Sequence, residues 1–396
     1  MSADRKAAIV GIHEYPLRVA RGVSAMQIKV DSIRAALADA GLSWADVDGL
    51  YDAGEGEASG GLQLSAYLGL NPTVIDTTNV GGSSYEFQAA HAVRDIAAGK
   101  CKVAVLSYGA TSASRRVAIG TGDRNSGAPN WRTNMERPYG STLISNYAMV
   151  KHRHMHQYGT TTEQLAGISI STRHHAMRNP HAVKAMQDLE FVGVSDLTVE
   201  DVLDSRMIAD PLHLLECCMI SDGGGALVIV APEVARDCAK PPVWIIGTGE
   251  ATKYVDNNSD LTISAAAQSG PIAFAEAGIT ACEIDIAMIY DSFTITVAIC
   301  LEDLGFCAKG EAGDFVADGR LAFDNAAEKL VMNTDGGGLS SNHPGMRGIF
   351  LLLEATRQLR GESSAQVADA RLAVAHGNGG MLGSVHTGGT VILARD

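Results

Sequence analysis

A glycine-rich stretch near the end of the chain, residues 333–348, places a histidine in a setting suited to catalysis. The stretch reads Asn-Thr-Asp-Gly-Gly-Gly-Leu-Ser-Ser-Asn-His-Pro-Gly-Met-Arg-Gly and has too much glycine for the interior of a helix or strand. The residues after it, Ile349 to Leu359, predict a buried helix with Pro344 near its first turn. His343 is therefore expected at a helix start, where a neutral imidazole among backbone N–H groups can polarise a carbonyl or hold an oxyanion. A helix-capping loop with an incidental histidine is the alternative.

The elements that must position His343 alternate between strands and helices in the first part of the chain. This alternation predicts a largely parallel sheet with helices on its faces. The pattern changes between about residues 110 and 206, where polar loops and amphipathic helices near 146–157 and 162–178 predict an inserted cap. The expected strands are Lys6–Gly11, Val47–Asp52, Thr73–Thr78, Val103–Tyr108 and Ala226–Val230, and the expected helices of the first part are Ser24–Ala40 and Ser83–Ala98.

The last part of the chain repeats the first. Ala36–Ser43 matches Ala273–Thr280, and the turn, helix and strand that follow Val80 recur after His343. In a pseudo-symmetric pair of halves, two helix starts of this kind can converge on one pocket. The sequence therefore predicts two fused halves, which are residues 1–235, including the cap, and residues 236–396.

Composition excludes several classes of function. The chain has 396 residues, of which 46% are hydrophobic and 19% charged, as is typical of a globular protein with a large core. A net charge of −14 argues against a surface that binds nucleic acid or an anionic membrane. No apolar run approaches the ~18 residues that span a bilayer, and the start of the chain shows no signal-peptide core.

The cysteine and histidine patterns point to a reducing compartment and away from a metal site. Seven cysteines without a Cys-x-x-Cys pair indicate a cytoplasmic protein, and the adjacent Cys217 and Cys218 are interpreted as packed thiols. His152, His154 and His156 lie close in sequence, but only the first and last share a helix face. No carboxylate or cysteine completes a ligand set there, so we expect no metal.

Two repeated halves, an inserted cap and an Asn-His-Pro-Gly turn together resemble the thiolase superfamily, above all its sterol-carrier-protein and lipid-transfer-protein branches. The segments Met155–Thr161 and Pro211–Cys218 are also similar to this family, and the resemblance covers essentially the whole chain. It implies a thiolase fold of five alternating layers, αβαβα, and a homodimer. It also implies chemistry on a coenzyme A thioester as substrate, without a covalently bound cofactor.

Three of the four catalytic positions depart from the thiolase pattern. The nucleophilic cysteine of a thiolase follows an asparagine at the first helix start, and here that place is taken by Val80, which cannot form a thioester. A shifted alignment would bring Ser83 or Ser84 there, but no base for an acyl-serine is identified. His376 replaces the second cysteine of the family, whereas the Asn-His-Pro turn keeps His343.

The remaining motif, Tyr-Asp-Ser-Phe from Tyr290 to Phe293, resembles the Tyr-Asp-x-Phe motif of the lipid-transfer-protein aldolases of steroid side-chain breakdown. Those aldolases work with a separate zinc-ribbon/OB-fold protein that helps bind the acyl-CoA, so the resemblance implies such a partner. They also carry a second tyrosine before their histidine–glycine turn, where this chain has Asn342.

A retro-aldol cleavage needs a base for the β-hydroxyl proton and donors that hold the thioester oxygen as the enolate forms. Tyr290 could take or relay that proton if a neighbouring histidine or Asp291 tunes it, because an unperturbed tyrosine, with a pKa of ~10, is a poor base at pH 7. Asp291 is more readily interpreted as a structural partner than as an acid. The candidate donors and substrate-binding residues are His343, His376, Asn378, Gly379, Gly380, Asn342, Val80, Ser83 and Ser84.

The sequence thus favours a thiolase-fold carbon–carbon lyase that acts on a β-hydroxyacyl-CoA with a steroid-like or aromatic acyl group. Two alternatives stay open. One is a thiolase-type acyltransferase that positions its acceptor without a cysteine thioester, and the other is a non-catalytic acyl-CoA or lipid carrier subunit.

Overall fold

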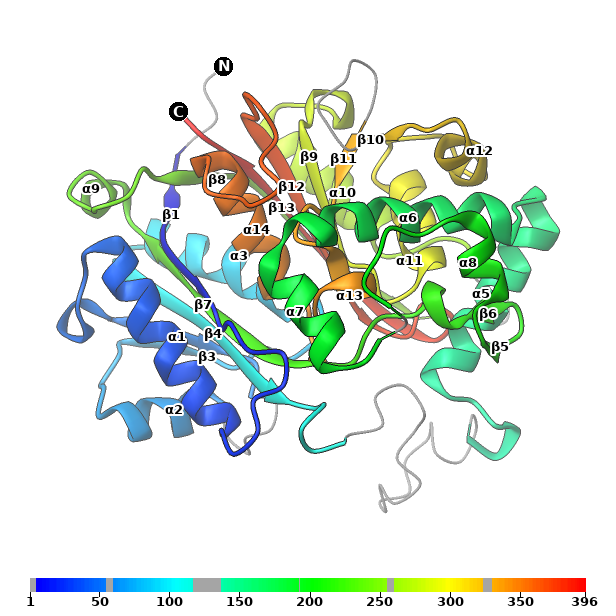
Figure 1. The fold of residues 1–396 in the computed structure, drawn as a ribbon. Helices are drawn as coiled ribbons and strands as arrows, with labels where there is room; N and C mark the ends of the chain where they lie inside the picture. Colours follow the sequence, from blue (N-terminus) through cyan, green and yellow to red (C-terminus); the bar gives the residue numbers. More distant parts are fainter. Residues whose placement is uncertain (1–4, 55–59, 117–136, 192, 255–259, 323–329) are drawn as a thin grey trace.

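The computed structural model describes residues 5–54, 60–116, 137–191, 193–254, 260–322 and 330–396 (Figure 1). The strands of its main sheet are β1 (Ala7–Glu14), β2 (Gly49–Asp52), β3 (Val74–Asp76), β4 (Val103–Thr111), β7 (Asp222–Val230), β8 (Val243–Tyr254), β9 (Ile286–Ile289), β10 (Leu321–Ala322), β11 (Leu330–Met332), β12 (Leu372–Gly380) and β13 (Val385–Ala394). The helices are α1 (Ala25–Ala40), α2 (Gly61–Leu68), α3 (Ser84–Ala97), α5 (Leu143–Tyr158), α6 (Thr162–Arg178), α7 (Pro180–Asp188), α8 (Val199–Asp204), α9 (Pro232–Ala235), α10 (Ala266–Ala277), α11 (Thr294–Asp303), α12 (Ala312–Ala317), α13 (Gly337–Ser340) and α14 (Gly348–Arg360).

The main sheet shows the internal repeat directly. Within the described residues its strand order is β10-β11-β9-β12-β13-β8-β1-β7-β4-β2-β3. The first half therefore reads β3-β2-β4-β7-β1, and the second half repeats this order as β11-β9-β12-β13-β8. The two halves join where β1 pairs with β8 through three residue pairs. The predicted boundary at residue 235 coincides with the end of α9 and stays a prediction.

The expectation of a largely parallel sheet is wrong. Among the described residues, only β2 in the first half, and β11 and β9 in the second half, run parallel to both of their neighbours. The pairs β4–β7, β1–β7, β12–β13 and β8–β13 are antiparallel. The reason is clearest at β12 and β13, because a turn of only four residues, 381–384, can join antiparallel strands but not parallel ones.

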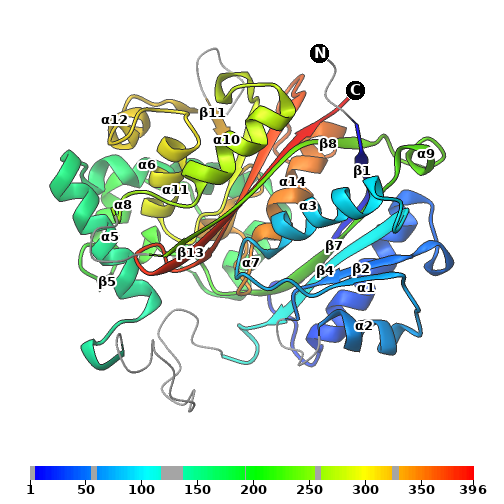
Figure 2. The ribbon, with the colours of Figure 1, turned by 180° about the vertical axis from the view of Figure 1, so that it is seen from behind.

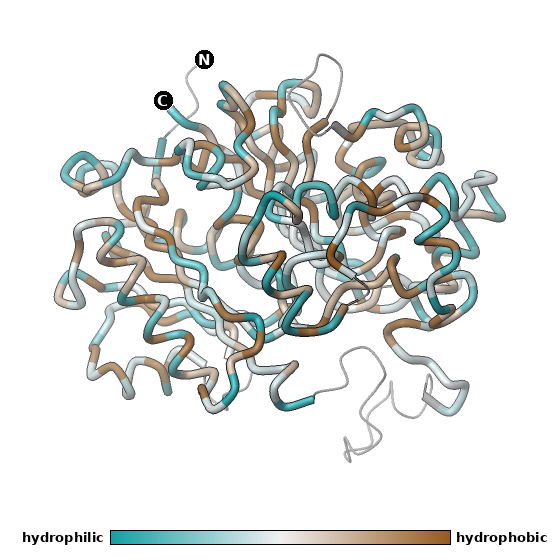
Figure 3. The backbone as a smooth tube through the Cα atoms, in the orientation of Figure 1, coloured by the Kyte–Doolittle hydropathy of each residue, from teal (hydrophilic) through white to brown (hydrophobic). Residues whose placement is uncertain are grey.

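The five layers implied by the family resemblance are confirmed. Helix α1 packs on β1, β4 and β7 of the first half, and α10 packs on β8 and β13 of the second half. Between the two halves lie α3 and α14, which contact strands of both (Figures 1 and 2). The hydrophobic residues gather in the strands and in this middle layer (Figure 3), so the centre of the molecule is an apolar core.

The inserted region forms a cap of α5 to α8 with two short strands, β5 (Met207–Ala209) and β6 (Leu212–His213); its residues 117–136 lie outside the described residues. Lys151 of α5 is buried and donates to Glu216 Oε1 at 2.6 Å, and the hydroxyl of Thr294, at the start of α11, donates to the same oxygen at 2.9 Å. This satisfied buried pair fixes the cap on the second half. No helix in the described ranges is long and apolar enough to cross a bilayer.

The helix after the glycine-rich stretch begins later than expected. Helix α14 starts at Gly348, five residues after His343, so Pro344 precedes the helix and is not in its first turn. The backbone N–H of His343 is also not free, because it donates to Ser221 Oγ at 3.0 Å. The helix dipole therefore does not act on this imidazole as the sequence predicted; burial and hydrogen bonds take its place.

A buried carboxyl in the middle layer gives a first testable prediction. Glu86 of α3 is 1% exposed and neither of its carboxyl oxygens has a hydrogen-bond partner among the described residues, so burial raises its pKa to about 8. Between pH 4.5 and 8 the unfolded chain releases this proton and the folded protein keeps it. We expect Glu86→Gln to gain a few kcal/mol of stability relative to wild type as the pH rises through this range. Chemical unfolding of both proteins at pH 4.5 and pH 8 measures this; a pH-independent difference would contradict it.

Candidate functional site

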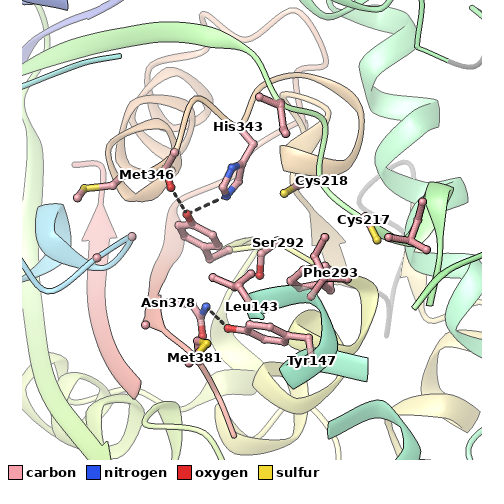
Figure 4. A pocket seen from close by; sticks show the side chains of 18 of the residues that line it. Leu143, Tyr147, Cys217, Cys218, Ser292, Phe293, His343, Met346, Asn378 and Met381 are labelled. Atoms are coloured by element: carbon pink, nitrogen blue, oxygen red, sulfur yellow. Dashed lines mark hydrogen bonds between the residues drawn. The ribbon is translucent and has the colours of Figure 1, made fainter. Parts of the chain in front are cut away.

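A cavity of about 550 Å³ lies where both halves and the cap meet (Figure 4). The first half contributes the turn before α3, and the second half contributes the glycine-rich turn before α14. The cap contributes α5, β5 with the residue before it, and the segment that follows β6. The prediction that the two turns converge on one pocket is therefore met in the structure. The lining residues are Gly81, Gly82, Leu143, Ile144, Tyr147, Arg206, Ile208, Leu214, Cys217, Cys218, Ile220, Tyr290, Ser292, Phe293, His343, Gly345, Met346, Asn378, Gly380 and Met381.

Tyr290 and His343 form a hydrogen-bonded pair in this cavity. The phenol oxygen of Tyr290 lies 2.9 Å from His343 Nε2, and it accepts the backbone N–H of Arg347 at 3.2 Å. Burial, together with the nearby Arg347 guanidinium, lowers the pKa of His343 to about 4. The imidazole is therefore neutral at pH 7 and can accept the phenol proton, while the Arg347 N–H stabilises negative charge on the phenol oxygen.

A buried arginine holds the two segments that carry this pair. Arg347 donates through Nε to Asp291 at 3.0 Å, through one terminal nitrogen to both oxygens of Asp335 at 2.8 Å, and through the other to Asn342 Oδ1 at 2.6 Å. Asp291 also accepts the backbone N–H groups of Gly338 and Leu339. Burial opposes the charge of Arg347, but the two carboxylates raise its pKa above the ordinary value. Asp291 and Asn342 thus fix the backbone and do not line the cavity.

The remaining predicted residues divide between the cavity and its surroundings. Asn378 and Gly380 line the cavity, whereas His376, Gly379, Val80, Ser83 and Ser84 are not among its lining residues. His376 is fully buried against β13, where its Nδ1 lies 2.9 Å from Thr390 Oγ1, and burial lowers its pKa to about 3. The two serine hydroxyls bond to Thr387 and to the Gly81 carbonyl. They serve the turn before α3, so neither is placed as a nucleophile.

The predicted histidine cluster of the cap is also a packing feature. His154 is fully buried, with Nε2 at 3.0 Å from Glu302 and Nδ1 at 2.9 Å from Thr160. His152 lies 3.3 Å from Asp210 at the surface. The rings of His152 and His154 thus each have a protein partner.

Comparison with known proteins decides the family. A model described as thiolase C-terminal domain-like matches residues 247–395. A steroid side-chain-cleaving aldolase from Thermomonospora curvata is 34% identical over 92% of both chains. An acetyl-CoA acetyltransferase from Methanothermobacter thermautotrophicus is 31% identical over 98% of both chains. A 17-hydroxy-3-oxo-4-pregnene-20-carboxyl-CoA lyase from Mycobacterium tuberculosis is 33% identical over 92% of this chain and 94% of the relative.

This chain belongs to the thiolase superfamily. A solved structure described as an Ltp2-ChsH2(DUF35) aldolase agrees, with a TM-score of 0.86 and 32% identity over 98% of both chains. The predicted thiolase fold is thus confirmed.

Two cysteines line the cavity of this thiolase-superfamily protein, which the sequence did not predict. Cys217 and Cys218 belong to an extended segment that lies, in space, between the Tyr-Asp-Ser-Phe motif and the His343 turn. The Cys218 N–H donates to the Ser292 carbonyl at 2.9 Å, and Ile220 pairs with His343. Burial raises the pKa of the Cys217 thiol to about 12 and that of Cys218 well above its usual range. Both thiols therefore stay protonated, which does not favour a nucleophilic role.

Gly82, in the turn before α3, lies between the ring of Tyr290 and the backbone of Asn378. A Cβ added to Gly82 would lie 2.4 Å from the Tyr290 ring and 2.4 Å from the Asn378 carbonyl oxygen. We expect Gly82→Ala to displace the tyrosine and to lower kcat by about 10²-fold, because misplacements of ~1 Å have such effects. Steady-state assay of the purified variant measures this.

The matched control is Gly69→Ala. Gly69 ends α2 at φ 68°, with no neighbouring atom within 4 Å of an added Cβ. It should lose ~1 kcal/mol of stability and keep its activity. Equal activities of the two variants would contradict the close approach at Gly82.

Proposed function

We propose that this protein cleaves a β-hydroxyacyl-CoA by a retro-aldol reaction. The observation that supports this best is the Tyr290–His343 pair, which faces the cavity. We assign Val80 to the position of the thiolase cysteine, so the proposed reaction uses no thioester to the enzyme. The β-hydroxyl proton passes to the Tyr290 oxygen as the phenol proton passes to His343 Nε2. The Cα–Cβ bond then breaks, so that the β-carbon becomes a ketone or aldehyde and the thioester becomes an enolate. Return of a proton to Cα gives the shortened acyl-CoA.

The proposed acyl group is bulky and apolar, steroid-like or aromatic. Leu143, Ile144, Ile208, Leu214 and Phe293 supply apolar walls, and about 550 Å³ is within the usual range of small-molecule sites. The relatives named for steroid side-chain cleavage and for a pregnene-carboxyl-CoA lyase support the same class.

We also propose that the protein works as a homodimer with a zinc-ribbon/OB-fold partner. The similar aldolase structure is named for two components, Ltp2 and ChsH2(DUF35), which supports the partner. For the dimer, β3 is the outermost strand of its half; Ile75 of β3 is exposed, as are Leu62 and Tyr67 of the helix α2 that contacts it. Seven cysteines without a disulfide among them fit the cytoplasm as the proposed location.

One relative, named acetyl-CoA acetyltransferase, favours a second candidate, a thiolase-type acyltransferase. It would position its acceptor without a cysteine thioester, because both thiols of the cavity stay protonated.

Product analysis tests the proposal. Purified protein is incubated with a 17-hydroxy steroid carboxyl-CoA, with and without the partner, and the products are separated by mass. A ketone together with a shortened acyl-CoA supports the lyase. Acyl transfer without chain cleavage identifies the second candidate, and tight binding without turnover identifies a carrier.

The pH dependence of the lyase follows from the neutral histidine. Since a protonated His343 cannot accept the phenol proton, activity requires the neutral ring, whose pKa is lowered to about 4. We expect kcat/KM to stay level from pH 7 to about 5 and to fall only as the pH approaches 4. An acid limb near pH 6.5, measured where circular dichroism shows the protein folded, would contradict the role of His343.

A further inference from the structure

A second tyrosine faces the same cavity and is held there by a buried hydrogen-bond chain. Tyr147, on the cap helix α5, is 1% exposed and its ring stacks on Phe293 with centroids 4.6 Å apart. Its oxygen accepts from Asn378 Nδ2 at 2.9 Å, and Asn378 Oδ1 in turn contacts His386 Nε2. In Figure 4, Tyr147 and Asn378 lie together, across the cavity from His343.

His386, at the far end of this hydrogen-bond chain, sets the direction of its donors and acceptors. His386 Nδ1 accepts the backbone N–H of Ala265 at 3.1 Å, and burial keeps the ring neutral by lowering its pKa to about 3. The hydrogen of a neutral ring must then be on Nε2, which donates to Asn378 Oδ1. This orients the amide so that its NH₂ group faces Tyr147.

As a result, the Tyr147 oxygen is used as an acceptor. It accepts the hydrogen bond from Asn378 Nδ2 at 2.9 Å, and the Leu382 backbone N–H and the Ser292 hydroxyl lie close enough to act on its pKa. The phenol proton is left to point toward Ser292 and the cavity that both residues line. A substrate oxygen can replace Ser292 as the acceptor of the phenol hydrogen bond. Ser292 then still has a partner, because Thr296 Oγ1 lies 3.1 Å from its hydroxyl oxygen.

Asn378, which holds this donor, lies close to the base. The backbone of Asn378 and the ring of Tyr290 are separated only by Gly82, at which a Cβ would lie 2.4 Å from each. A β-hydroxyl oxygen at Tyr290 is carried by Cβ, and a thioester oxygen at Tyr147 is carried by the carbonyl carbon. Both carbons are bonded to Cα, and the Cα–Cβ bond is the one that breaks. The two phenols thus flank the reacting segment, while His376, the donor expected from the sequence, is turned into the core.

We propose that Tyr147 is a catalytic residue that donates a hydrogen bond to the thioester oxygen as the enolate forms, and that His386 and Asn378 are positioning residues for it. The inference rests on the proposed lyase function and adds the group that stabilises its intermediate. A donor aimed at the developing oxyanion contributes more in the transition state than in the bound substrate, so its loss lowers kcat rather than raising KM.

The first test is Tyr147→Phe in the full-length protein with its partner. We expect kcat to fall by about 10²- to 10³-fold with KM nearly unchanged, as for removal of one oxyanion-hole donor. The matched control is Tyr158→Phe, at the other end of α5, where the hydroxyl bonds Gln157 outside the cavity; it should keep wild-type kcat. A Tyr147→Phe variant with kcat within threefold of wild type would overturn the proposal.

A second measurement separates this proposal from the function on which it rests. In D₂O, an enolate-stabilising site exchanges the Cα protons of a short acyl-CoA such as propanoyl-CoA, and mass spectrometry follows the exchange. Exchange that depends on Tyr147, without cleavage of any β-hydroxyacyl-CoA, would support the donor and refute the lyase. Cleavage by wild type with exchange unaffected in Tyr147→Phe would refute the donor, and neither reaction in wild type would refute both.

The positioning residue is tested by rescue. His386→Leu removes the Nε2–H that orients Asn378, and we expect kcat to fall by about tenfold or more. His386→Gln, whose amide N–H can replace it, should recover most of that loss. In the Tyr147→Phe background, His386→Leu should have little further effect, because the chain then orients no donor. Multiplicative losses would show that His386 acts independently of Tyr147.

Discussion

We expect Tyr290→Phe to lose at least about 10³-fold in kcat/KM for cleavage of the β-hydroxyacyl-CoA, while the protein stays folded. The phenol oxygen is the proposed acceptor of the β-hydroxyl proton, and a positioned acid–base group contributes about 10²- to 10⁴-fold. The ring remains in place, so the cavity keeps its shape. The lost hydrogen bonds to His343 and the Arg347 N–H cost about 1–3 kcal/mol of stability. Single-turnover product formation and chemical unfolding measure the two effects separately.

Tyr51→Phe is the matched control for this variant. Tyr51 occupies the position in the first half that is equivalent to Tyr290 in the second half. It is likewise buried, and its hydroxyl lies 2.9 Å from Asp95. It lies outside the cavity, so it should cost similar stability and leave the kinetics unchanged. If both variants lose activity alike, the effect comes from packing; if Tyr290→Phe keeps a tenth of wild-type activity, the base is another group.

The sequence predicted the parts of the site that depend on local pattern and repeat. The glycines that end matching helices, Gly41 and Gly278, have nearly the same left-handed φ, 72° and 70°, because both halves use the same helix stop. The repeat placed Val80 and His343 at equivalent turns, and both turns border the cavity. The motif and its resemblance singled out Tyr290, which contacts His343 across 53 residues of sequence.

What the sequence did not predict depends on how distant segments dock. Tyr147 and Cys218 reach the cavity only because the cap folds back on the second half, and no local periodicity encodes that contact. His376 lies within β12, where the repeat predicts a strand, yet its ring bonds Thr390 of the neighbouring strand β13. The dipole argument for His343 failed for a similar reason: where α14 begins is decided by the bonds of Arg347 and Ser221, which are long-range.

Arg347→Met should be the most destabilising single substitution near the site. Arg347 is fully buried and is the cation that Asp291 and Asp335 share, so its removal leaves two buried carboxylates without compensation. Breaking a buried pair from one side costs about 3–5 kcal/mol. Arg347→Lys should recover little of this, because one ammonium cannot reach the three acceptors that the guanidinium bonds at once. Urea unfolding measures both variants.

The origin of that loss can be isolated in the same protein. Arg94→Met removes a side chain that is 59% exposed and pairs with Glu250 at 2.8 Å, and it should cost under ~1 kcal/mol. Adding Asp291→Asn and Asp335→Asn to Arg347→Met removes the uncompensated charges and should restore part of the stability. Activity should stay low in this triple variant, because the guanidinium also tethers Asn342, next to His343. A loss within 1 kcal/mol for Arg347→Met alone would mean that the glycine-rich turn holds its shape without this ion network.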